Sequence, residues 1–437
     1  MSPVPANDVW LGKMPSDWQR SRIRNVAVLS PNYSQTRPAA DEPCAVVPME
    51  LVSDDGAIDV STHHLPEDVS SGLTLFEKGD VLFAKITPCM ENGKGAFVRQ
   101  LPTRYAFGST EFHVLRPGEK VDGQFLYYAT FNPIYRAYAA ENMVGAAGQK
   151  RVSSRFLKDT RLFLPPLVEQ QRIAAYLDAS CAAVDAAVAA KRRQLETLDT
   201  LRKTTIKRAV MMGLNPSVKM KRTEVEWIPE MPQHWRLVRV KDVLEFFNTV
   251  RVPLSAAERG VMTERTYDYY GASGVIDKVE AYHFDGTYIL IAEDGANLLT
   301  RSKPLAFLAT GKFWVNNHAH ILKPRWGGDD TFFVALLESQ DFSLFVTGAA
   351  QPKLTMENLG RFKMAVPRVA EQKEIAVFIQ ERDAEFRILF AQIERQIETL
   401  VSYRKSLIHE CVTGQRRITG ADAARARRGT AGADRPC

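Results

Sequence analysis

A carboxylate and a lysine two positions apart, Glu371 and Lys373, have the local spacing with which a nuclease surrounds a metal ion. The stretch Glu371-Gln372-Lys373 also opens a segment with helical periodicity. A carboxylate is favoured there, because the N-terminus of a helix carries partial positive charge. The matching stretch earlier in the chain reads Glu169-Gln170-Gln171 and lacks the lysine. We therefore interpret both stretches as helix starts.

His318 and His320 alternate on a presumed strand and in principle could hold a metal ion. No third ligand is evident near them, and the matching stretch offers Glu111 and His113 instead. We therefore expect no metal site, and we interpret these histidines as surface or ligand-contacting residues.

Other catalytic signatures are missing. The sequence has no GxGxxG or P-loop string for a nucleotide, and no NPPY or DPPY tetrapeptide of the kind that amino-methyltransferases use. LPPL at 164–167 has no polar acceptor. The glycine-rich stretch VGAAG at 144–148 is echoed by TGAAQ at 347–351, so we interpret VGAAG as a loop. The chain lacks the parts of an enzyme, and we expect no catalysis.

Size and composition suit a globular protein of two or three domains, with 437 residues, 45% hydrophobic and 25% charged. No apolar run approaches the ~20 residues that span a bilayer, and the N-terminus lacks a signal-peptide pattern. We therefore expect a cytoplasmic protein. The five cysteines form no CxxC pair and are expected to be free thiols.

The net charge of +6 is unevenly distributed. Residues 415–437 carry six arginines and two aspartates, so the rest of the chain is nearly neutral. Such a chain would hold a nucleic acid through local patches, or through contacts borrowed from a basic partner. We expect the 415–437 tail to be disordered, with non-specific DNA contact as its alternative role.

The chain repeats itself with a period near two hundred residues. Four echoes occur in the same order in both halves, and each half reads as one globular region followed by one helical region. The offset shrinks from 217 to 202, so the second variable region is 15 residues shorter. The pairs are WLGKMPSDWQRSRIRNV (10–26) with WIPEMPQHWRLVRVKDV (227–243), STEFHVLRP (109–117) with NHAHILKP (317–324), GAAGQKRVSSRFLKDTRLFLPPLVEQQRIAAYLD (145–178) with GAAQPKLTMENLGRFKMAVPRVAEQKEIAVFIQ (348–380), and LETLDTLRKTTIKRAVMMG (195–213) with IETLVSYRKSLIHECVTG (397–414).

Each helical region carries apolar or long-stemmed residues at alternating steps of three and four, which is typical of a coiled-coil seam. No helix breaker occurs before Gly213 and Gly414, so each helix should cover about 44 residues, or ~65 Å. The seam positions are Val184, Val188, Lys191, Leu195, Leu198, Arg202 and Ile206 in the first helix, and Phe386, Phe390, Ile393, Ile397, Leu400, Arg404 and Ile408 in the second.

The short connection at 214–224 places the second globular region near the far end of the first helix, which predicts an antiparallel helix pair. Charges agree, because 191–208 is basic and the start of the second helix is acidic. Opposite charges select orientation more than they add stability, and solvated faces remain the alternative for any one pair.

The globular regions read as mixed α and β structure. Alternating runs at 79–86, 111–117, 287–294 and 318–324 predict strands, and 123–141 and 331–348 each predict one or two helices. The order of the strands stays open.

Repeat, seam and loop motifs together resemble the specificity subunit of a type I restriction-modification system. The resemblance rests on PPLVEQQRIAAYLD and VPRVAEQKEIAVFI at the helix starts, RKTTIKRAVMMG and RKSLIHECVTG at the helix ends, and the MPSDW and MPQHW openings. It departs modestly, since Pro165-Pro166 becomes Pro367-Arg368 and the tail after 414 is longer. The family implies two target-recognition domains that each read one half of a bipartite, asymmetric DNA site.

We accordingly expect an α+β fold with two similar mixed α/β target-recognition domains, joined by two long helices that form an antiparallel coiled coil. Two unlike domains related by a pseudo-twofold axis would suit two different half-sites about a helical turn (~34 Å) apart. The expected segments are recognition domain 1 (1–168), helical spacer 1 (169–213), a linker (214–224), recognition domain 2 (225–370), helical spacer 2 (371–414) and the tail (415–437).

Candidate DNA-contacting residues are polar or basic side chains in loops framed by the repeat. Gln149 and Gln351 occupy matching positions, which also fits a shared structural turn, so residues that differ between halves are the better readers. The candidates are Lys85, Thr87, Asn92, Lys94, Ser109, Thr110, Gln149, Lys150 and Arg151 in the first domain, and Asn297, Arg301, Asn316, Asn317, His318, Gln351 and Lys353 in the second.

The resemblance also implies partners and cofactors. The helices would dock methyltransferase subunits, two copies by the duplication, which bind S-adenosylmethionine. Restriction and translocation subunits would bring ATP and Mg²⁺, and the chain itself would hold no cofactor. Two alternatives remain: a self-contained DNA methyltransferase or nuclease, and a coiled-coil scaffold that does not bind DNA.

Overall fold

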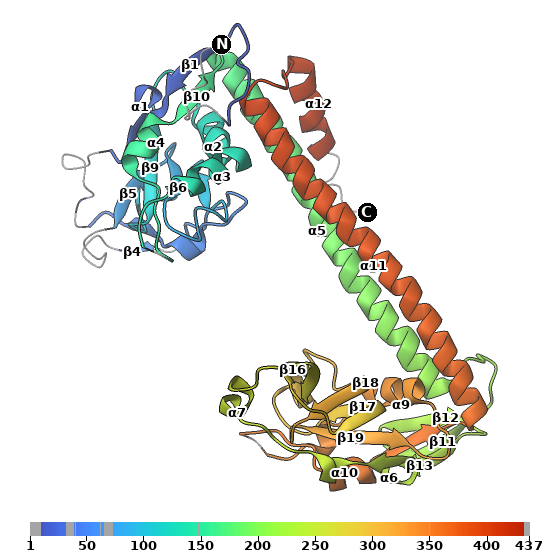
Figure 1. The fold of residues 1–437 in the computed structure, drawn as a ribbon. Coiled ribbons are helices and arrows are strands. Elements are labelled where there is room, and N and C mark those ends of the chain that lie inside the picture. The colour runs from blue at the N-terminus through green and yellow to red at the C-terminus, as the bar shows by residue number, and fades with distance from the viewer. Residues whose placement is uncertain are drawn as a thin grey trace. The chain divides into compact units, whose positions relative to one another are not determined.

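Two compact units make up the structure, and the boundary between them falls inside two long helices, α5 (Leu167–Met212) and α11 (Val369–Val412). Each unit therefore holds one globular domain and a part of each helix (Figure 1). The first unit is Met1–Arg192 with Arg395–Cys437, and the second is Arg193–Glu394. The computed structural model describes residues 10–31, 39, 41–61, 63–64, 73–146, 148–348 and 350–431.

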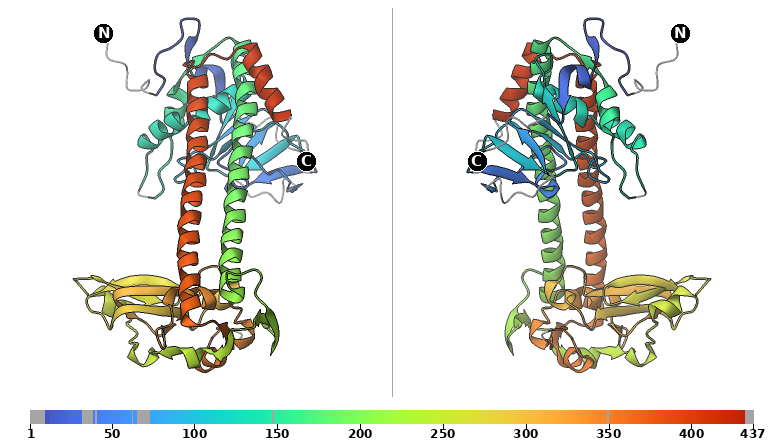
Figure 2. Two further views of the ribbon diagram at one scale, coloured as in Figure 1. Left: turned by 90° about the vertical axis from the view of Figure 1, so that its right-hand side faces the viewer. Right: turned by 90° about the vertical axis from the view of Figure 1, so that its left-hand side faces the viewer.

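The two helices run antiparallel within each unit, as the sequence predicts (Figure 2). In the first unit, Ile173 shares a core with Val412, and Asp185 further along α5 accepts a hydrogen bond from Nε of Arg404. In the second unit, Nε of Arg202 lies 2.8 Å from Oδ1 of Asp383. The predicted meeting of a basic α5 end with an acidic α11 start is thus realised by an ion pair.

The predicted seam is also confirmed, because every seam position on both helices is buried or half-buried while most of their neighbours are exposed. The first turn of each helix begins two residues before the predicted start. By length and composition alone, one stretch of α5 could cross a membrane, although the sequence analysis expected no such stretch. Residues such as Ile173, Leu177 and Cys181 of α5 are buried in the core of the first unit, so we interpret α5 as a core helix.

The globular domain of the first unit contains two four-stranded sheets. All strand pairs are antiparallel except β3 with β8. In order, the sheets are β2 (Ala27–Leu29), β9 (Phe112–Pro117), β6 (Val81–Ala84) and β7 (Gly95–Phe97), and β4 (His63–His64), β3 (Cys44–Val47), β8 (Tyr105–Gly108) and β5 (Thr74–Glu77). The strand pair β1 (Gln19–Arg22) and β10 (Arg161–Leu164) and the helices α1 (Ile23–Val26), α2 (Gly123–Phe131), α3 (Pro133–Glu141) and α4 (Ser154–Asp159) complete the domain.

The domain of the second unit has one six-stranded sheet instead. In order, its strands are β14 (Leu244–Phe246), β19 (Ala319–Pro324), β17 (Phe284–Ala292), β18 (Ala306–Val315), β15 (Tyr267–Gly271) and β16 (Gly274–Val279). The other elements are the pairs β11 (Met220–Val225) with β12 (Ile228–Pro232) and β13 (Arg236–Arg239) with β20 (Lys363–Val366), and the helices α6 (Val240–Val243), α7 (Ala256–Gly260), α8 (Asn297–Thr300), α9 (Asp330–Glu338) and α10 (Met356–Arg361).

The two domains share one plan despite the different sheets. The order β2-β9-β6-β7 corresponds to β14-β19-β17-β18. The long strands β17 and β18 each do the work of two strands in the first domain, because β17 covers β5 and β6, and β18 covers β7 and β8. The parallel pair of β3 with β8 likewise returns as β15 with β18. A single turn at Ser343–Phe345 replaces α3, which accounts for part of the shorter second half.

A glutamine in the first turn of each long helix ties that helix to its globular domain. Oε1 of Gln170 accepts a hydrogen bond from the Asp122 backbone N–H at 2.8 Å, and its Nε2 donates to the Pro165 carbonyl at 2.8 Å. In the second unit, Gln372 binds Asp329 N–H and the Pro367 carbonyl in the same way. Since Asp122 and Asp329 are the N-caps of α2 and α9, one side chain fixes two helix starts at once.

The expectation of a disordered tail at 415–437 is wrong for residues 415–431, and 432–437 lie outside the described residues. Residues 415–431 continue from α11 into a further helix, α12 (Gly420–Ala431), and Ile418 and Ala423 are buried in the core of the first unit. Arginine content alone suggested disorder, but alanines and an isoleucine at helical spacing supply an apolar side that the core covers.

Replacing Gln170 by alanine should lower the free energy of unfolding by about 2 kcal/mol, because the buried Asp122 N–H and Pro165 carbonyl lose their partner. Chemical denaturation of Gln170→Ala, with the exposed neighbour Gln171→Ala as the matched control, measures this loss. Equal stability of the two variants would contradict the role assigned to Gln170.

Candidate nucleic-acid interface

Three segments of the first domain converge at the ends of β6 and β9. The Lys85 N–H donates to the Glu111 carbonyl at 2.9 Å, and the Val152 N–H donates to the Lys85 carbonyl at 2.8 Å. The Thr87 N–H donates to the Lys150 carbonyl at 3.0 Å. We call residues 85–87, 109–111 and 144–152 the first loop cluster.

The second domain repeats this arrangement bond for bond. The Glu293 N–H donates to the His318 carbonyl at 2.9 Å, the Leu354 N–H to the Glu293 carbonyl at 2.7 Å, and the Gly295 N–H to the Pro352 carbonyl at 3.0 Å. We call residues 293–295, 316–318 and 347–354 the second loop cluster. The two clusters are therefore the same backbone frame carrying different side chains.

A buried histidine locks each frame. Nε2 of His113 lies 2.8 Å from the Val152 carbonyl, and Nε2 of His320 lies 2.7 Å from the Leu354 carbonyl. Burial lowers the pKa of both histidines, so the neutral ring with a proton on Nε2 is the form that donates to these carbonyls. The imidazoles stabilise the loops and are not available for a ligand. The prediction that His320 is a surface or ligand-contacting residue is therefore wrong, because its ring is fully buried and bound to the Leu354 carbonyl.

A glycine closes each glycine-rich loop. Gly145 and Gly348 have φ of 135° and 88°, and a Cβ on either would lie within 2.8 Å of the carbonyl oxygen of Gln149 or Gln351. Only glycine fits such a turn without displacing backbone. The interpretation of 144–148 as a loop is thus confirmed for residues 144–146 and 148, and Ala147 lies outside the described residues.

The charged pairs of the two clusters differ. In the first, Arg151 donates to both carboxylate oxygens of Glu111, and this hydrogen bond lowers the pKa of Glu111. In the second, burial would raise the pKa of Glu293, but the hydrogen bond from Arg251 and nearby positive charge hold it below its ordinary value. Lys353 pairs with that same carboxylate at 3.2 Å.

The first loop cluster brings together most of the first-domain candidates. Lys85, Thr87, Lys150 and Arg151 are joined by the bonds above, and Oγ of Ser109 accepts from the Glu111 N–H at 3.2 Å. The side chains of Thr110, Gln149 and Lys150 are exposed. Asn92 and Lys94 lie elsewhere: Asn92 lines a cavity beside α5 and α11, and Lys94 donates to the Met49 carbonyl.

The second loop cluster gathers Asn316, Asn317, His318, Gln351 and Lys353. The buried Asn316 side chain accepts from the His318 N–H at 2.8 Å, whereas Asn317, His318, Gln351 and Lys353 are exposed. Two candidates lie outside it and support their own loops. The Asn297 amide binds Lys303, and the Arg301 guanidinium binds the Gln340 carbonyl.

Groups that hinted at catalysis have other partners. Glu371 accepts from Nε1 of Trp235 at 3.0 Å and faces Nε2 of His234 at 2.8 Å. His318 binds Asp294, and across the described residues no three metal-ligating side chains gather. Cys44, Cys89, Cys181 and Cys411 are free thiols, as expected, and Cys437 lies outside the described residues.

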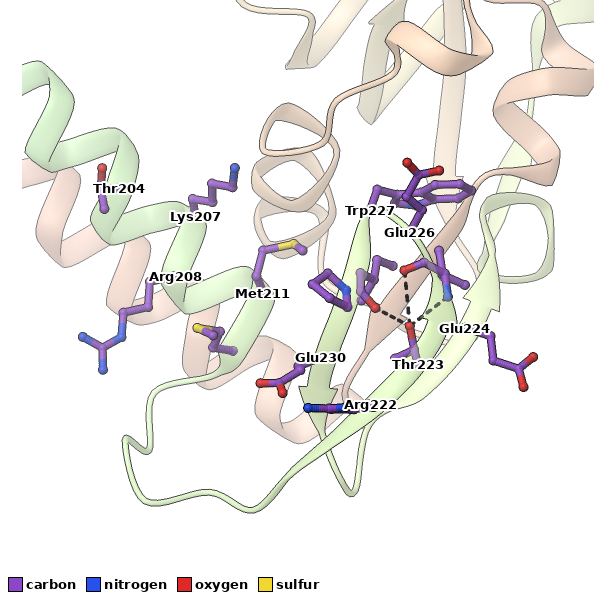
Figure 3. A pocket seen from close by; sticks show the side chains of 14 residues that line it. Thr204, Lys207, Arg208, Met211, Arg222, Thr223, Glu224, Glu226, Trp227 and Glu230 are labelled. Atoms are coloured by element: carbon purple, nitrogen blue, oxygen red, sulfur yellow. Dashed lines mark hydrogen bonds between the residues drawn. The ribbon is translucent and has the colours of Figure 1, made fainter.

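A groove in the second unit lies between the end of α5 and the β11–β12 hairpin (Figure 3). Lys207, Arg208 and Met211 line one side, and Trp227 and Thr223 the other. Oγ1 of Thr223 donates to the Ile228 carbonyl, so this hydroxyl holds the hairpin together.

The sequence-derived candidates omit several residues that hold the clusters together, namely Glu111, His113, Arg251, Glu293 and Asp294. A signal for the histidines was present, because His113 and His320 align in the echo of 109–117 with 317–324. The other residues carry no such signal, since Arg251 reaches Glu293 only through the fold.

The buried His320 should make stability depend on pH. Because its pKa is lowered in the folded state, its contribution to stability is present above the unfolded pKa of about 6.5 and is lost as the pH falls further. Between pH 7.5 and pH 5, the His320→Gln variant should therefore lose about 1 kcal/mol less stability than the original chain. Thermal unfolding across this range tests the difference, with the exposed His283→Gln as control; parallel slopes for all three chains would refute it.

Comparison with known proteins agrees with this duplicated plan. The sequence matches the family model for the type I restriction modification DNA specificity domain over residues 15–197 and 232–399. The specificity subunit of the EcoAI type I restriction enzyme of Escherichia coli is 32% identical over 164 residues, which are 37% of this chain and 27% of that protein. The chain thus spans about a quarter of the length of the E. coli relatives that it matches.

Solved structures share the fold at low identity. A chain from a study of complex assembly and conformational transition of the type I R-M system aligns with a TM-score of 0.71 and 17% identity, over 92% of this chain and 98% of that one. The HsdS subunit from Thermoanaerobacter tengcongensis aligns with a TM-score of 0.54 and 17% identity over the same shares. With two family matches on two domains of one plan, the chain belongs to the family of type I restriction-modification DNA specificity domains.

Proposed function

We propose that this chain is the DNA-reading specificity subunit of a type I restriction-modification complex, without catalytic activity of its own. Each globular domain reads one half of a bipartite, asymmetric site in double-stranded DNA. The observation that carries the proposal is the pair of loop clusters: an identical backbone frame presents Thr110 and Lys150 in one domain and Asn317 and His318 in the other. Different side chains on one frame suit two different half-sites.

Roles within the clusters follow from chemistry. The exposed Lys150 and the half-buried Lys85 suit phosphate oxygens, which position the protein without reading sequence. Exposed amide, hydroxyl and imidazole groups, as in Thr110, Asn317 and His318, suit base edges in the major groove. Ion pairs such as Arg151 with Glu111 hold the loops in place. Lys94, Asn297 and Arg301 act as supporting residues, and Asn92 lines a cavity outside the cluster.

The long helices dock two methyltransferase subunits, and restriction and translocation subunits join through them. S-adenosylmethionine, ATP and Mg²⁺ bind to those partners, and this chain needs no cofactor. The assembly works on DNA in the cytoplasm. The exposed apolar side chains on the helices, which include Leu201, Val377 and Ile388, support a role in docking, because covering apolar surface with a partner is favourable.

The function is tested by footprinting DNA with the chain co-expressed with its methyltransferase subunit. We expect protection of two different short sequences, separated by an unprotected spacer of fixed length. Protection of a continuous or palindromic site would contradict the proposal. As a control for catalysis, the chain alone with Mg²⁺ and S-adenosylmethionine should neither cut nor methylate DNA.

Thr110 and Asn317 occupy equivalent positions, so their alanine variants form a matched pair. Asn317→Ala should weaken discrimination at one base pair of the second half-site by about tenfold, within the 1–3 kcal/mol typical of a base contact, and leave the first half-site unchanged. Thr110→Ala should act on the first half-site alone. Competition binding with DNA substituted in either half measures both; a variant that affects both halves equally would refute its assignment as a reader.

A further inference from the structure

The C-terminal segment 415–431 covers the beginning of α5 in the first unit. Figures 1 and 2 show α12 alongside the N-terminal part of α5. Ile418 and Ala423 are buried in the same core as Ile173 and Tyr176, and the guanidinium of Arg416 lies 5.6 Å from the ring centre of Tyr176. The opposite side of α12 exposes arginines at 425, 427 and 428. This segment has no counterpart in the second unit, where residues 213–219 lead from α5 to β11.

Positions at the start of α5 are less exposed than the equivalent positions of α11, as expected if the C-terminal segment covers α5. Ala175 is half-buried while its counterpart Val377 is 53% exposed. Tyr176 is 8% exposed and its counterpart Phe378 is half-buried. The same holds one turn before and after, since Arg172 is half-buried and Ala179 buried, whereas the counterparts Glu374 and Glu381 are exposed. The start of α11 therefore presents a surface that α5 has covered.

The C-terminal segment also binds the carboxylate of Glu169. In the second unit, Glu371 accepts from the indole N–H of Trp235. In the first unit, the equivalent Glu169 is bound by Arg417, whose Nε lies 3.1 Å from Oε1 and which also pairs with Asp17. The indole N–H of Trp18 is buried and has no hydrogen-bond partner among the described residues. Arg417 thus holds the carboxylate that the duplicated plan would give to Trp18.

The C-terminal segment also fills the first-unit counterpart of the groove in Figure 3. The groove of Figure 3 lies between α5 at Lys207 and the hairpin at Pro229. The equivalent positions in the first unit are His409 and Gly12, and the Gln415 amide lies between them, 3.0 Å from Nε2 of His409 and 3.4 Å from where a Cβ at Gly12 would stand. The tail begins in the place that the second unit leaves open.

We propose that residues 415–431 are an intramolecular occupant of one of the two methyltransferase-docking surfaces, so that a methyltransferase subunit binds the open surface of the second unit first and must displace the tail to bind the first unit. This inference rests on the proposed function of the helices. Because the tail covers only one of two equivalent docking surfaces, the two methyltransferase subunits bind in separate steps. Its displacement frees Glu169 to accept from Trp18, as Glu371 does from Trp235.

The test is stepwise binding of the methyltransferase subunit to the full chain, followed by native mass spectrometry and calorimetry. We expect the second copy to bind at least about tenfold more weakly than the first, which is a coupling of ordinary size. Arg417→Ala, Ala423→Asp and a chain ending at Gly414 should each bring the second affinity to within about threefold of the first. Arg428→Ala removes a charge from the exposed side of α12 and is the matched control, which should keep the two steps unequal.

A readout without the partner accompanies this test. The indole N–H of Trp18, labelled with ¹⁵N and assigned with Trp18→Phe, should exchange more slowly with solvent in Arg417→Ala, because it then donates a hydrogen bond to Glu169. Two equal affinities in the full chain, or unequal affinities that persist in both Ala423→Asp and the truncated chain, would overturn the tail's role while leaving the proposed function standing. Failure of the methyltransferase subunit to bind any of these chains would overturn the proposed function and this inference together.

Discussion

The hydrogen bonds of Gln170 and Gln372 are the constraint on which each unit depends. Each side chain joins the first turn of a long helix to the N-cap of α2 or α9, so the helix and the globular domain are fixed by one buried amide. A glutamine suits this task because it donates and accepts at once. The neighbouring glutamate has a different partner in each unit: Glu371 binds Trp235, while Glu169 binds Arg417. The glutamine thus makes the same bonds in both units, while the glutamate beside it distinguishes them.

The loop clusters follow the same logic at the other end of each sheet. Backbone hydrogen bonds, a buried histidine and a closing glycine are common to both domains. Since these elements use main chain and buried rings, they leave the exposed side chains at 110, 150, 317 and 318 free to vary. A recognition module of this kind can change its specificity by substitution without losing its frame, and a duplicated pair can diverge into two readers of different sequences.

The repeat allowed the helices, their antiparallel sense, their seam and the main strands to be predicted, because these depend on periodicity and on residues close in sequence. Strand order was left open, since β17 and β18 fuse what the first domain builds from four strands, and no local pattern reveals that pairing. Asn92, Lys94, Asn297 and Arg301 share the composition of the loop candidates but lie outside the clusters. The helical tail was missed because its apolar side, with Ile418 and Ala423, is short and its arginines dominate the composition.

The central claim is that two unlike reading domains share one frame, and exchanging the domains tests it most directly. A chain in which residues 27–152 are replaced by their equivalents 244–354 would carry two copies of the second domain on otherwise unchanged helices. Its binding preference, measured by selection from random DNA with the methyltransferase subunit present, should consist of two identical half-sites in place of two different ones. A folded chain that still selected the original asymmetric site, or that lost sequence preference altogether, would contradict the account.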